Sequence, residues 1–136
     1  MSETTGAEAR TGADDEAVAL AHTLFDAARE GNSEFLRSYL QAGAPAAMRN
    51  AAGDSLLMLS AYHGHVETVQ LLLLHGAEAN VANDRGQTPL AGAVFKGYTE
   101  VARVLLDAGA DPDAGAPTAR EAAQMFARTE ILELLG

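Results

Sequence analysis

Apolar residues recur along this chain in short blocks at helical spacing, and glycines and polar connectors separate the blocks. Thr88 and Pro89 are typical of a helix start, because the threonine oxygen can accept a bond from a first-turn amide and proline has no N–H to leave unpaired there. The apolar positions of residues 90–94 then share one face of a short helix. We expect Gly97 to end it, since glycine tolerates the left-handed backbone that often follows a helix.

A second helix is expected over residues 98–108, ended by Gly109. Its inward positions are Val101, Val104, Leu105 and Leu106. Two short helices joined by a tight turn cannot bury their own apolar faces. The unit therefore needs neighbours on which to stack.

The same pattern returns at a shift of 33 residues, because segment 83–110 matches segment 50–77. Equivalent positions include Gly53 and Gly86, Ser55 and Thr88, Leu57 and Leu90, Gly64 and Gly97, Glu67 and Glu100, and Gly76 and Gly109. One further shift reaches Leu24, Gly31, Glu34, Leu40 and Gly43. A fixed period of this length predicts an all-α stacked array. We expect one domain over 15–136, with units at about 15–49, 50–82, 83–113 and 114–136.

The first and second units carry small departures from this pattern. We expect Asp14 or Asp15 to cap a first helix that runs to Glu30, with an apolar stripe that includes Val18, Leu20, Ala21, Leu24, Phe25 and Ala28. Residues 1–14 are polar and acidic without periodicity, which predicts a disordered tail. In the second unit Ser55 takes the capping position before helices over 56–63 and 66–75, and Leu74 is expected to be exposed.

The fourth unit is shortened, as suits a terminal cap. Its connector is about three residues shorter than the others, so Thr118 takes the capping position. Ala127 replaces the glycine after the first helix, and the last helix is expected over 129–135.

These motifs resemble the ankyrin repeat family over about residues 20–136. The family's D-x-x-G-x-T-P-L-H-x-A-A-x-x-G run is met by Gly86, Thr88, Pro89, Leu90, Ala93 and Gly97. Its V-x-x-L-L-x-x-G-A run is met by Val66, Val69, Leu72, Leu73, Gly76 and Ala77, and again by Val101, Leu105, Leu106, Gly109 and Ala110. The resemblance implies an α-solenoid of helix-turn-helix units that binds a protein partner on its concave face.

Composition narrows the classes of function. The formal net charge is −10, which argues against binding a nucleic acid backbone. The chain has no cysteine, and no apolar run approaches the roughly 20 residues needed to span a membrane. The acidic N-terminus has no basic or apolar segment typical of a secretory signal. We expect a cytoplasmic monomer, and the alanine-rich, lysine-poor composition favours a bacterial source.

Candidate chemistry is sparse. The four histidines lack cysteine or paired carboxylate partners at a spacing typical of zinc sites, and His65 is expected to pack against its neighbours. No nucleophile elbow or phosphate-binding loop occurs, and the glycines follow the repeat period. We therefore expect no catalysis, no metal and no cofactor.

The resemblance also implies partner contacts at two sets of positions. Partners of the family are usually held by the two residues before the glycine that ends each first helix, and by the tips of the hairpin-like connectors. The first set is Arg29, Glu30, Tyr62, His63, Phe95, Lys96, Met125 and Phe126. The tip set includes Asp54, Asp84, Arg85 and Gln87. Tyr62, Phe95 and either Met125 or Phe126 would then lie side by side as an exposed row; the alternative is that Phe95 and Phe126 pack as part of the core.

Two functions remain open at this point. The first is an adaptor or regulator that binds one protein partner through this row. The alternative is an acidic charge mimic that covers a basic, nucleic-acid-binding surface of another protein. Binding that collapses at moderate salt would favour the mimic, and salt-tolerant binding that depends on Tyr62 and Phe95 would favour the row.

Overall fold

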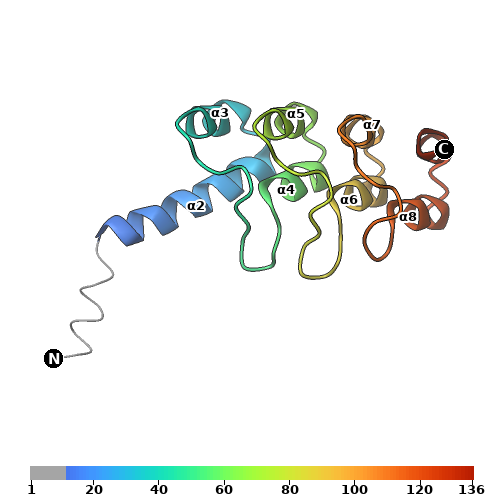
Figure 1. Ribbon diagram of the computed structural model, residues 1–136, viewed down its shortest axis with the longest axis horizontal. Helices are drawn as coiled ribbons and strands as arrows, with labels where there is room; N and C mark the ends of the chain where they lie inside the picture. Colours follow the sequence, from blue (N-terminus) through green and yellow to red (C-terminus); the bar gives the residue numbers. More distant parts are fainter. Residues whose placement is uncertain (1–11) are drawn as a thin grey trace.

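The computed structural model describes residues 12–136, and side chains from residue 15 onward (Figure 1). This part of the chain forms eight α-helices. They are α2 (Gly12–Glu30), α3 (Ser33–Gln41), α4 (Leu56–Tyr62), α5 (Val66–Leu74), α6 (Pro89–Lys96), α7 (Thr99–Asp107), α8 (Ala119–Met125) and α9 (Thr129–Leu135). The only β pairing within it is an isolated bridge between Arg49 and Ser55.

The helices stack in two rows (Figure 1). The first helices of the units, α2, α4, α6 and α8, form one row, and α3, α5, α7 and α9 form the other. The connectors between units extend as loops beyond the row of first helices. The predicted all-α solenoid of helix pairs is thus confirmed.

Helix starts follow the expected capping chemistry. The Thr88 hydroxyl accepts a bond from the Ala91 amide at 3.1 Å, and the Ser55 hydroxyl accepts one from the Met58 amide at 3.0 Å. Gly97 follows α6 with a left-handed φ of 80°. In the fourth unit, Thr118 accepts from the Glu121 amide while the Glu121 carboxylate accepts from the Thr118 amide, which completes a capping box.

The start of the first helix differs from the prediction. Helix α2 begins at Gly12, so the expected cap at Asp14 or Asp15 is wrong, and residues 12–14 of the predicted disordered tail are helical. Carboxylates at the positive end of a helix are favourable, which lets the acidic residues lie inside the first turn. Residues 1–11 of that predicted tail lie outside the described residues.

The first half of α2 extends beyond the stack (Figure 1). Val18 was expected in the apolar stripe but is 48% exposed, since no helix of the described chain covers that part of α2. Other helix ends differ from the predicted bounds by one residue, because His63, His75, Tyr98 and Ala108 are cap residues.

The core repeats with the units. Buried leucines recur at equivalent positions, as in Leu24, Leu57 and Leu90, and in Leu72 and Leu105. Small side chains separate the first helices, because Ala28, Ala61 and Val94 are all fully buried at the same spacing. Leu74, on the second-helix row, is 83% exposed, as predicted.

Each unit also places a side chain against a glycine of the unit before it. A Cβ atom on Gly31 would lie 2.5 Å from the His65 ring, one on Gly64 would lie 3.0 Å from Tyr98, and one on Gly97 would lie 3.0 Å from Arg128. His65 Nε2 donates to the Arg29 carbonyl oxygen at 2.6 Å. The packing role expected for His65 is thus confirmed.

Candidate functional site

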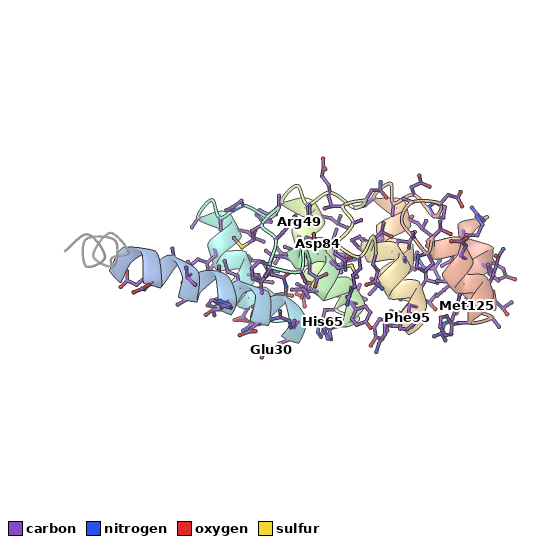
Figure 2. All side chains as sticks on the ribbon, turned by 90° about the horizontal axis from the view of Figure 1, so that it is seen from below. Glu30, Arg49, His65, Asp84, Phe95 and Met125 are labelled. Carbon is purple, nitrogen blue, oxygen red and sulfur yellow. The ribbon has the colours of Figure 1, made fainter. Side chains whose placement is uncertain are left out.

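The predicted contact residues of the first helices lie at the C-terminal ends of α2, α4, α6 and α8. Figure 2 shows the labelled members Glu30, Phe95 and Met125 along one edge of the molecule, with His65 between them. Arg49 and Asp84, from the loops, lie across the first-helix row from that edge. The stacking of the units therefore aligns residues that are 30 to 33 positions apart in the sequence.

Tyr62, Phe95 and Phe126 form a continuous set of ring contacts, which we call the aromatic row. The Tyr62 and Phe95 rings are stacked, with centroids 6.5 Å apart and an interplanar angle of 10°. The Phe95 and Phe126 rings meet edge to face at 5.0 Å. Phe95 is 42% exposed and Phe126 is 41% exposed, so these rings contact each other on the surface.

Two cations lie over the aromatic row. Lys96 Nζ is 5.4 Å from the centre of the Tyr62 ring, and the Arg128 guanidinium is 5.6 Å from the centre of the Phe126 ring. Arg128 also donates to the carbonyl oxygens of Val94 and Phe95, at 3.2 and 2.8 Å. These contacts fix the end of α6 against the fourth unit.

A cleft of about 200 Å³ lies next to the row. It is lined by Asp54, Met58, Leu59, Tyr62, His63, Arg85 and Gln87. Met58 and Leu59 are buried, whereas Arg85 and His63 are exposed. The cleft thus brings together two predicted first-helix residues and three predicted loop-tip residues.

Hydrogen bonds hold the loop tips in place. Asn83 Oδ1 accepts from the amides of Arg85 and Gln87, each at 3.0 Å, and Asn83 Nδ2 donates to Asp54 at 2.8 Å. Asn50 makes the equivalent pair of bonds one unit earlier. Sequence reasoning missed Asn50 and Asn83 as supports, although their spacing of 33 residues was a usable signal.

Arg49 links the same loops and was also missed. Its Nε donates to the Gly53 carbonyl oxygen at 3.0 Å, and its Nη2 donates to the Ala82 carbonyl oxygen at 2.7 Å. The Asp84 amide donates to the Ala52 carbonyl oxygen at 3.1 Å. Asp84 is exposed and does not line the cleft, unlike the predicted tip residues Asp54, Arg85 and Gln87.

His63 lies in a locally cationic environment. Partial burial lowers the pKa of His63 below its usual value of 6.5, and the positive charges of His65, Arg29 and Lys96 lower it further. The His63 ring meets the Tyr62 ring edge to face at 5.6 Å. The imidazole is therefore mainly neutral near pH 7 in the folded protein.

The predicted residues at the two ends of the row lie apart from the cleft. Arg29 forms an exposed ion pair with Asp26 at 2.8 Å, and Glu30 is exposed beside it. Met125 is 69% exposed and does not line the cleft. The structure thus brings Tyr62, His63, Phe95, Lys96 and Phe126 together. Arg29 lies close enough to lower the pKa of His63, but Arg29, Glu30 and Met125 do not line the cleft.

Sequence reasoning missed a second groove at the N-terminal end. It measures about 500 Å³ and is lined by Val18, Ala21, His22, Phe25, Arg29, Asn50, Ala51 and Ala52. The groove lies between α2, which supplies five of these residues, and the loop at Asn50, Ala51 and Ala52. The unusual length of the first helix in the sequence was the signal for it.

Other kinds of site find little support in residues 12–136. No three or more histidine, aspartate or glutamate side chains in this range are arranged to hold a metal ion. None of the helices in this range combines the length and the apolar character needed to cross a membrane. The features available for binding at this site are the aromatic row, the cations Lys96 and Arg128 beside it, and the adjoining cleft.

Comparison with known proteins agrees with this architecture. The family described as ankyrin repeats (3 copies) matches residues 24–116, which is more than half of the chain. The Pseudomonas aeruginosa protein named "Putative ankyrin repeat protein PA3287" is 60% identical over 42 residues, which are 31% of this chain and 25% of that protein. The chain thus aligns with only a quarter of this relative's length. The family match and the stacked helix pairs show that the chain belongs to the ankyrin repeat family.

Proposed function

We propose that this protein is an adaptor or regulator that binds one protein partner through the aromatic row and the adjoining cleft, without catalysis. Ankyrin repeats are a protein–protein interaction module, which gives the general class. The observation that carries the specific proposal is the continuous contact of Tyr62, Phe95 and Phe126 at the surface. We further propose that it acts as a cytoplasmic monomer and does not bind nucleic acid.

Exposed aromatic rings beside a cleft favour a binding function. Aromatic and arginine side chains account for much of the binding energy in protein interfaces. Phe95 and Phe126 would lose water from their free faces when a partner covers them. Met58 and Leu59 provide an apolar base for the cleft, and His63 and Arg85 provide polar groups at its rim.

The rigidity of the surface favours binding as well. Asn50 and Asn83 hold the loop tips, and Arg128 holds the end of α6. A preformed surface loses little conformational entropy when a partner docks. A small number of anchoring side chains can then supply useful affinity.

The test is the double substitution Tyr62→Ala/Phe95→Ala, compared with Leu74→Ala. Leu74 is an exposed apolar residue on the other row of helices, so it controls for the loss of apolar surface in general. We expect the double variant to lose capture of the partner from cells that contain the native protein, and Leu74→Ala to retain it. The free energy of unfolding of the double variant should fall by only about 1–2 kcal/mol, because surface ring pairs contribute about 0.5–1.5 kcal/mol each.

Two results would contradict the proposal. Undiminished capture by the double variant would place the binding surface elsewhere. A loss of about 4 kcal/mol or more would show that the two rings act as core residues. Partner binding that disappears at moderate salt and is unchanged in the Tyr62→Ala/Phe95→Ala variant would favour the charge-mimic alternative.

A further inference from the structure

The lysine and arginine side chains of residues 15–136 divide into two groups. Four arginines form ion pairs with carboxylates, namely Arg29 with Asp26, Arg37 with Glu67, Arg103 with Glu100, and Arg120 with Asp113. The other four are Arg49, Arg85, Lys96 and Arg128, and no carboxylate of residues 15–136 lies within 4.0 Å of their side-chain nitrogens. In a chain with a net charge of −10, this lack of acidic partners requires an explanation.

All four cations of the second group lie on the loops or beside the ends of the first helices. Arg49 and Arg128 donate to backbone carbonyl oxygens, so their charges are positioned but not neutralised. Lys96 lies over the Tyr62 ring, and Arg85 lines the cleft. The ion-paired arginines lie on both rows of helices, Arg29 and Arg120 on first helices and Arg37 and Arg103 on second helices, and none of them lines the cleft.

The cleft beside them fits a single side chain. Its volume of about 200 Å³ is smaller than the roughly 300–1,000 Å³ of pockets that enclose drug-sized ligands. Met58, Leu59 and Tyr62 line it with apolar atoms, and Arg85 lies at its edge. An aromatic or aliphatic side chain next to an acidic one matches both properties.

We propose that the partner presents an acidic segment of polypeptide, with an apolar side chain in the cleft and neighbouring carboxylates on Arg85 and Lys96. This inference rests on the proposed function and specifies the chemistry of the partner. Asp54 lines the cleft and accepts a hydrogen bond from Asn83, Asp84 is exposed outside the cleft, and within residues 15–136 neither forms an ion pair. Arg85 and Lys96 carry positive charges that no carboxylate of residues 15–136 pairs, and these charges complement an acidic segment although the whole chain is acidic.

The experiment uses a random peptide library displayed on phage and selected on the full chain. Enriched peptides are synthesised and titrated against the wild type, and an oligothymidylate is titrated in parallel as a probe for nucleic acid. The test variant is Arg85→Glu/Lys96→Glu. The matched control is Arg37→Glu/Arg103→Glu, which makes the same change in charge on the second helices.

The inference predicts peptides in which aspartate or glutamate stands next to phenylalanine, tyrosine, leucine or methionine. Their affinity should fall at least about tenfold in Arg85→Glu/Lys96→Glu and change less than about threefold in the control. Peptides that depend on Tyr62 and Phe95 but are basic or uncharged would overturn this inference and leave the proposed function standing. Tight binding of the oligothymidylate by the same residues would also overturn it. Enriched peptides whose affinity is unchanged in the Tyr62→Ala/Phe95→Ala variant would contradict both proposals.

Discussion

Two features of the structure favour glycine at positions 31, 64 and 97: the backbone conformation and the close approach of the next unit. The backbone is left-handed at all three positions, and the next unit places His65, Tyr98 or Arg128 where a side chain would otherwise lie. Ala127 occupies the equivalent position in the fourth unit with a φ of 52°. Ala127 is exposed and belongs to the last unit of the described chain.

Comparing Gly31→Ala with Gly43→Ala separates the two features. Both glycines have positive φ, but a Cβ on Gly31 would meet the His65 ring, whereas one on Gly43 has no atom within 4 Å. We expect Gly43→Ala to cost about 1–2 kcal/mol for the left-handed backbone. Gly31→Ala should cost about 1–3 kcal/mol more, because His65 must move. Equal losses in urea denaturation would show that the contact between units contributes nothing.

The lowered pKa of His63 predicts a dependence of stability on pH. The unfolded chain binds a proton at His63 more readily than the folded chain, because burial and the charges of His65, Arg29 and Lys96 oppose protonation in the fold. The contribution of His63 to stability is thus present above about pH 6.5 and is lost as the pH falls through the lower folded pKa. His63→Gln should lose less stability than the wild type between pH 7.5 and 5.

Lys96→Gln provides a second check on this effect. It removes one of the positive charges that lower the pKa of His63, so it should reduce the same pH dependence by a smaller amount. Denaturant midpoints measured across this pH range test both variants. An unchanged slope in His63→Gln would refute the assigned cause.

At the scale of the helix, local chemistry fixes where most elements begin. Thr88, Ser55 and Thr118 were predicted as caps and are caps, because a capping bond involves residues only three positions apart. The start of α2 was predicted wrongly because two acidic residues that resemble caps lie inside its first turn. Composition alone cannot distinguish a cap from a favourable first-turn residue.

Thr118 offers a direct test of the capping chemistry. Thr118→Ala removes the capping box at the start of α8 and should cost about 1 kcal/mol in the free energy of unfolding. Thr99→Ala is the control, since Thr99 is the first residue of α7 and the preceding cap residue Tyr98 makes no side-chain capping bond. The control should change stability by less than about 0.5 kcal/mol. Similar midpoints for both variants would mean that the box does not stabilise α8.

At the scale of the whole molecule, the 33-residue period was sufficient to predict the fold but not the full site. Tyr62 and Phe95 could be predicted as neighbours because a stacked array aligns equivalent positions. The roles of Arg49 and Arg128 could not be predicted from the period, because they depend on hydrogen bonds to carbonyl oxygens 33 or 34 positions away. The N-terminal groove was missed because it depends on how the loop at residues 50–52 packs beside α2.

The most direct test of the central claim is an NMR titration of the ¹⁵N-labelled protein with an enriched peptide or the captured partner. The size of 14.1 kDa suits a residue-by-residue measurement. We expect the largest amide shifts at Tyr62, His63, Phe95 and Lys96 and in the loop at 84–87, with little change along α5 and α7. Shifts concentrated on α5 and α7, with the aromatic row unaffected, would contradict the account.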